Sequence, residues 1–85
     1  MKIIDNEKGF KVIAIDRLTL IEKLSCFGVC DSCNSTPQVG YWVAVLNCWL
    51  CPECYKDWYD NATNYPEDHE VENMHFKLMK QILDL

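Results

Sequence analysis

The chain has 85 residues, including six cysteines, and carries a formal net charge of −5. A chain this short buries only a modest share of its surface, so we expect one domain that its apolar core alone would leave marginally stable. The acidic balance argues against general binding to phosphate backbones.

The first residues hold no long apolar run and no small-residue cleavage site, so we expect neither a secretory signal nor a membrane anchor. A cytoplasmic location follows as an expectation, and a reducing cytoplasm keeps thiols from forming disulfides. Residues 2–4 and 10–15, separated by a polar turn that ends at Gly9, predict a β-hairpin.

Asp16 stands where it can cap a short helix, because its carboxylate can accept hydrogen bonds from backbone N–H groups two or three residues later. The predicted apolar face of this helix consists of Leu18, Ile21 and Leu24. A continuous strand through residues 18–21 is the alternative.

Four of the cysteines form two Cys-x-x-Cys pairs, Cys30 with Cys33 and Cys51 with Cys54, with seventeen residues between the pairs. This spacing is typical of a structural zinc site, in which each short loop supplies two of the four thiolates at the corners of a tetrahedron. We therefore expect one structural Zn²⁺ held by these four residues. Such a site has no open coordination position for hydrolysis. Since no acid, base or nucleophile converges elsewhere, we expect no catalytic residue and no enzyme.

Cys26 and Cys48 place a third thiol ahead of each pair. A register that uses Cys48 with Cys51 is conceivable, but it would leave Cys54 unused one turn into a predicted helix. We expect both additional cysteines to act as small buried hydrophobic residues.

Residues 40–46 have strand composition, and Asn47 with Cys48 can turn the chain back into a short strand at residues 49–50. A helix should start at Cys51-Pro52, because proline is favoured in a first helical turn. Its predicted apolar face is Tyr55, Trp58, Tyr59 and Ala62. We interpret the aromatic residues of this region mainly as core around the metal loops.

A last helix is predicted from about residue 66 to residue 84, with acidic residues near its start and lysines near its end. An apolar seam recurs along it with 4-3-4-3 spacing at Val71, His75, Leu78, Ile82 and Leu85. We expect this seam to fold onto the domain rather than to pair with a second copy, so a monomer is favoured over a dimer. His75 is then a partly buried packing residue, and His69 is solvated.

The order of a cysteine loop, a hairpin and a cysteine pair at a helix start resembles a treble-clef zinc finger over residues 26–62. The resemblance implies an α+β fold with zinc ligands at Cys30, Cys33, Cys51 and Cys54. Residues 1–25 would add a hairpin and short helix to the finger core at 26–63, and residues 64–85 would add the C-terminal helix. Cys-Pro-x-Cys also occurs in rubredoxin-like iron sites, so the metal in purified protein could be zinc or iron.

Acidic residues concentrate in the C-terminal part, where residues 52–85 carry eight acids and three bases. We therefore expect a small zinc-binding adaptor or inhibitor, encoded in a phage or mobile element, that binds a basic protein through its aromatic hairpin or its acidic helical end. The alternative is a nucleic-acid-binding zinc finger or transcriptional regulator. Its basic patch would comprise Lys2, Lys8, Lys11, Arg17 and Lys23.

Overall fold

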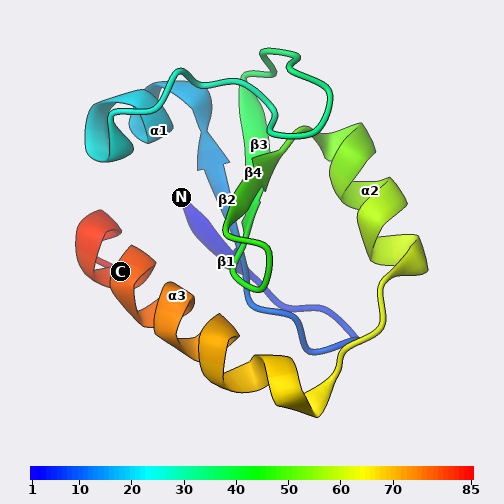
Figure 1. The fold of residues 1–85 in the computed structure, drawn as a ribbon. Coiled ribbons are helices and arrows are strands. Elements are labelled where there is room, and N and C mark those ends of the chain that lie inside the picture. The colour runs from blue at the N-terminus through cyan, green and yellow to red at the C-terminus, as the bar shows by residue number, and fades with distance from the viewer.

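The computed structural model describes residues 1–85 and has an α+β fold, with one four-stranded antiparallel sheet, three α-helices and one short 3₁₀ helix. The elements in chain order are β1 (Lys2–Ile4), β2 (Val12–Asp16), α1 (Arg17–Leu24), β3 (Val39–Val43), β4 (Cys48–Leu50), α2 (Pro52–Asn61), η1 (Pro66–Asp68) and α3 (His69–Leu83). The sheet order β1-β2-β3-β4 follows the chain. Figure 1 shows the sheet between α2 on one side and α1 with α3 on the other. No helix combines the length and apolar character needed to cross a membrane.

Both faces of the sheet are buried, because successive strand residues point to opposite faces and both sets are apolar. On one face lie Ile13, Ile15, Trp42 and Trp49, packed with residues of α1 and α3. On the other face lie Val12, Val43 and Leu50, packed with residues of α2 and with the cysteine loops. The sheet is thus the middle layer of three.

The aromatic side chains of α2 pack against the sheet as the sequence predicts. The rings of Tyr41 and Tyr55 are stacked with centroids 4.5 Å apart, and Phe10 lies 4.7 Å from Trp58. Aromatic pairs at these separations add stability beyond the area that they bury. The face of the β3–β4 hairpin that carries Tyr41 is therefore covered by α2, whereas Trp42 and Trp49 lie on the face toward α1 and α3.

Helix α1 is capped by Asp16, whose carboxylate accepts hydrogen bonds from the Thr19 backbone N–H at 3.0 Å and the Thr19 hydroxyl at 2.6 Å. The predicted cap and helix are confirmed, and the alternative strand is wrong. The predicted apolar face is wrong in part, because Leu20 is buried and Leu18 is 69% exposed. Leu20 is the α1 residue that packs into the core on the face of the sheet that α1 covers.

Replacing Asp16 with alanine should lower the free energy of unfolding at pH 7 by about 1 kcal/mol, the usual effect of losing an N-cap. The hydrogen bonds to Thr19 lower the pKa of Asp16 from its ordinary 3.8. The stabilisation is therefore complete above that value and is lost as the pH falls through the lowered pKa of the folded state. Urea unfolding at pH 7 measures the difference. Asp16→Asn keeps a capping oxygen, so it should lose clearly less stability than Asp16→Ala.

Helix α3 turns a different face to the sheet than the sequence predicts. Its buried residues are Glu72, Met79 and Leu83, whereas the predicted seam keeps Val71, Leu78, Ile82 and Leu85 between 45% and 53% exposed. Two polar contacts accompany this rotation of the helix. The Glu72 carboxylate accepts from the Lys11 backbone N–H at 3.0 Å, and His75 Nδ1 lies 2.7 Å from the Ala44 carbonyl.

The β3–β4 hairpin is shorter than predicted, since β3 ends at Val43 rather than at residue 46. A turn follows in which the Asn47 N–H donates to the Ala44 carbonyl at 3.2 Å, and Asn47 has a positive φ of 53°. Asparagine tolerates this left-handed conformation better than most residues. The turn returns the chain into β4, which leads directly to Cys51.

Candidate metal centre

Four sulfur atoms meet where the loop at residues 30–33 faces the start of α2. The Sγ atoms of Cys30, Cys33, Cys51 and Cys54 all lie within 4.8 Å of one another, and those of Cys33 and Cys51 are 3.7 Å apart. Zinc–sulfur bonds of about 2.3 Å in a tetrahedron place the sulfurs roughly 3.8 Å apart. The set therefore fits a zinc-sized ion.

Backbone N–H groups point at two of these sulfurs. The N–H groups of Ser32 and Cys33 donate to Cys30 Sγ at 3.4 and 3.5 Å, as expected for the tight turn between the first two thiols. Cys51 is the N-cap of α2, and its Sγ accepts from the Cys54 N–H at 3.5 Å. Such hydrogen bonds hold the sulfurs in place and favour the thiolate that a metal requires.

The loop that carries Cys30 is closed by its own backbone. The Cys30 N–H donates to the Ser35 carbonyl at 2.8 Å, and the Asn34 N–H donates to the Cys30 carbonyl at 2.9 Å. Asn34 has a positive φ of 63°. Asparagine at this point lets the chain reverse directly after the second thiol of the pair.

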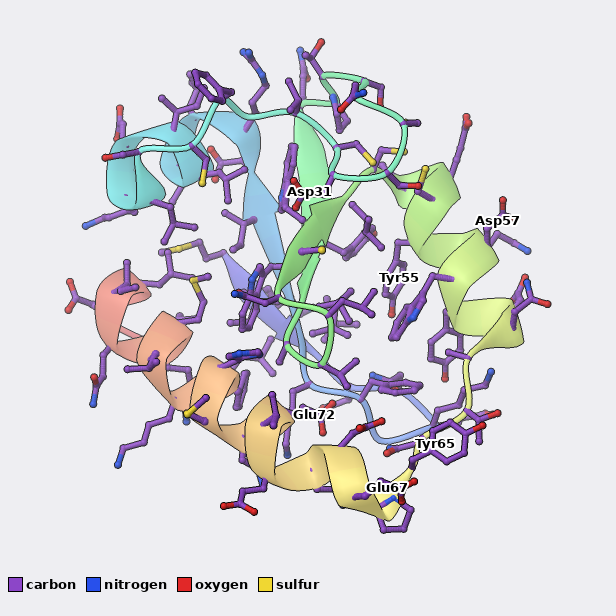
Figure 2. The ribbon with its side chains drawn as sticks, in the orientation of Figure 1. Asp31, Tyr55, Asp57, Tyr65, Glu67 and Glu72 are labelled. Carbon is purple, nitrogen blue, oxygen red and sulfur yellow. The ribbon has the colours of Figure 1, made fainter.

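Asp31 ties the same loop to the free edge of β4 (Figure 2). Its N–H donates to the Trp49 carbonyl at 3.0 Å, and its carboxylate accepts from the Trp49 N–H at 2.8 Å. Both groups of Trp49 would otherwise be unpaired, because β4 ends the sheet. One residue between two thiols therefore fixes the first cysteine pair relative to the sheet.

The four thiols differ in how readily they lose a proton. Hydrogen bonding from Ser35 lowers the pKa of Cys33 to about 6. Burial opposes ionisation of Cys30, but backbone N–H groups outweigh it and lower the pKa of that thiol. The hydrogen bond from the Cys54 thiol to Cys51 raises the pKa of Cys54 to about 12. Without a cation, the group of four sulfurs thus keeps at least one proton, on Cys54. Metal binding should therefore release protons.

The two additional cysteines stay outside the cluster. Cys26 is exposed, so the expectation that it is buried is wrong. Cys48 is half-buried, and burial raises its pKa. The register that pairs Cys48 with Cys51 is therefore not the one that the structure adopts.

Neither histidine joins a cluster of metal-ligating side chains. His75 is partly buried against the Ala44 carbonyl, as predicted for a packing residue. His69 is exposed, and its Nε2 lies 2.7 Å from the side-chain oxygen of Asn64. The four-sulfur group is the one candidate metal centre of the chain.

Two residues of the centre were not identified from the sequence. Asp31 secures the loop to β4, and the Ser35 hydroxyl lies 3.1 Å from Cys33 Sγ. Small polar residues beside a cysteine pair are a general signal for hydrogen bonds to thiolates. The partner of Asp31 depends on tertiary structure, so the sequence gives no signal for it.

Comparisons of the chain with protein-family models, with curated proteins and with solved structures find no match. What the four cysteines can bind therefore follows from their own geometry and chemistry.

Proposed function

We propose that this chain binds one structural Zn²⁺ through Cys30, Cys33, Cys51 and Cys54 and acts as a non-enzymatic protein-binding adaptor or inhibitor. The single observation that carries the metal assignment is the convergence of four sulfurs within 4.8 Å. Thiolates in a tetrahedral set select zinc or iron over hard cations such as Mg²⁺. Four protein ligands fill the coordination sphere, which supports a structural rather than a catalytic role.

The arrangement of the centre also supports the treble-clef resemblance. A cysteine loop, the β3–β4 hairpin and a cysteine pair at the start of α2 follow one another in the chain and surround the same four-sulfur group. This type of finger serves several functions, so the function has to be argued from the surface.

An acidic surface at the junction of α2 and α3 supports binding to a basic protein. Exposed carboxylates lie on α2, on η1 and at the start of α3, and Figure 2 shows two of them, Asp57 and Glu67, apart from each other at the surface. The full set is Asp57, Asp60, Glu67, Asp68 and Glu70. Lys56 neutralises one of them through a 2.9 Å contact with Asp60. A partner with a basic nucleic-acid channel would complement this surface.

The alternative of a nucleic-acid-binding finger is less favoured, because three of its five bases make contacts within the fold. The Lys8 ammonium donates to the Tyr59 and Ala62 carbonyls at the end of α2. Lys11 lies over the Phe76 ring, and Arg17 donates to the Gly28 carbonyl. A phosphate would have to compete with these contacts.

Native mass spectrometry tests the metal, and we expect one Zn²⁺ per chain that a chelator removes. Affinity purification from the native host then tests the acidic surface. A double variant, Asp57→Lys with Glu67→Lys, should lose the retained protein. A charge-matched control, Asp5→Lys with Glu22→Lys, changes two exposed carboxylates elsewhere and should keep it.

Loss of the retained protein from both double variants would show only sensitivity to net charge and would contradict a specific acidic surface. Strong binding to generic duplex DNA that weakens steeply with salt would favour the nucleic-acid alternative instead.

A further inference from the structure

Helix α3 has a second apolar face, beside the face that packs on the sheet, that stays about half exposed. Every turn of the helix contributes one residue to it. This open face consists of Val71, Met74, Leu78 and Ile82, and Leu85 follows just after the end of the helix; each of the five is between 45% and 54% exposed. An apolar stripe that runs the length of a helix is unusual on a lone soluble domain and marks an interaction site.

The open face borders a groove of about 640 Å³ between α3 and α1. The floor of the groove includes Trp42 and Trp49, and Leu78 and Ile82 line its α3 side. Phe27 lines it from the loop after α1 and is 88% exposed. No lysine or arginine lines the groove. The apolar surface therefore extends from α3 across to the loop at residues 25–29.

The sequence expectation of a monomer depended on the predicted seam folding onto the domain, and the structure leaves that seam exposed. We infer that the open face of α3 and the adjoining groove form the interface of an antiparallel, two-fold symmetric homodimer. This inference does not depend on the acidic surface, of which Glu70 alone is used in the interface argument.

The charges along α3 favour a second copy in antiparallel orientation. Glu70 lies one turn before Met74 and Lys77 lies one turn after it, and both are exposed beside the open face. A two-fold axis near Met74 brings Glu70 of each copy toward Lys77 of the other, whereas parallel helices would place like charges together. Opposed helix dipoles add to this preference. The surface is thus complementary to itself, as an isologous interface requires.

The proposed interface spans the length of α3 and the groove between α3 and α1. Stable interfaces cover roughly 800 Å² on each partner, and the whole surface of this chain measures 5470 Å². Helix α3 is about 22 Å long at 1.5 Å per residue, and the groove widens its open side to the loop that carries Phe27. The net charge of −5 opposes association only weakly, because salt near 0.15 M screens charges beyond about 8 Å.

Sedimentation equilibrium of the metal-loaded full chain tests the inference. The wild-type chain of 10.0 kDa should sediment as a dimer in the upper micromolar range. Leu78→Glu should be monomeric, because it buries two charges in the interface. The matched control Leu18→Glu places the same charge on an exposed leucine of α1 outside the groove, and it should remain dimeric.

Charge reversals test the orientation of the two helices. Glu70→Lys and Lys77→Glu should each weaken the dimer several-fold, because each replaces an attraction with a repulsion in both symmetric pairs. The double reversal should restore wild-type association. Weakening by both single changes without restoration in the double variant would overturn the antiparallel arrangement.

An NMR dilution series of the wild-type chain keeps the test independent of whether Leu78→Glu folds. Amide signals of residues 71–85 and of the loop at 25–29 should shift with concentration. A wild-type chain that stays monomeric into the millimolar range would overturn the inference, and so would shifts confined to other surfaces. A dimer that persists in folded Leu78→Glu would overturn it as well.

Discussion

Removing the metal is expected to unfold the chain. Binding energies of roughly 10–16 kcal/mol are typical of structural zinc sites, and they are as large as the roughly 5–15 kcal/mol of net stability that whole domains possess. The four cysteines also join the loop at residues 30–33 to the start of α2, so their release removes that link. Circular dichroism and tryptophan fluorescence during chelation should show loss of structure, and added Zn²⁺ should restore it.

Two exposed cysteines provide a matched test of the same prediction. Cys33 belongs to the sulfur cluster and Cys26 does not, yet both side chains are exposed. Replacement of either by serine creates no core cavity. Cys33→Ser should therefore lose most of the zinc affinity and unfold at a much lower temperature, whereas Cys26→Ser should match the wild type. Equal behaviour of the two variants would contradict a metal-dependent fold.

Replacing Gly40 with alanine is expected to cost about 3 kcal/mol of stability, at the upper end of the usual range for overpacking a core. A Cβ at this position would lie 2.8 Å from the Leu50 carbonyl oxygen and even closer to the Trp49 ring. The ring cannot withdraw freely, because its N–H donates to the Ile15 carbonyl at 3.1 Å in the buried core. Thermal unfolding of the metal-loaded chain measures the loss.

A double-mutant cycle separates this contact from a general effect on the strand. In a Trp49→Leu background the ring is absent, so Gly40→Ala should cost far less than it does in the wild type. If Gly40→Ala lowers the stability by the same amount in both backgrounds, the added Cβ acts on the backbone and not on the Trp49 ring.

The metal centre is largely predictable from the sequence, because its information is local. The spacing of Cys30, Cys33, Cys51 and Cys54 is sufficient to select the residues that converge. Pro52 in the first turn marks the start of α2. Asp16 likewise marks the start of α1, since a capping side chain acts on the backbone of its own turn.

The rotation of α3 is not predictable in the same way. Its apolar residues cover an arc too wide for periodicity to choose one face, because Met79 and Leu83 lie beside Leu78 and Ile82 around the helix. The observed rotation also buries Glu72, which the sequence alone would place at the surface. Its carboxylate is instead buried and bonded to the backbone of Lys11, a partner 61 residues away. Only the assembled sheet supplies that partner.

The bonds between Asp31 and β4 connect the metal loop to the open edge of the sheet. Asp31 shields the outer edge of β4, and it sits between two of the clustered cysteines. Loss of the ion would loosen this loop and free the backbone of Trp49 beside the apolar Leu50. Uncovered strand edges of this kind recruit further chains into aggregates. With the proposed Zn²⁺ bound, the same loop would therefore both close the metal site and keep this strand edge covered.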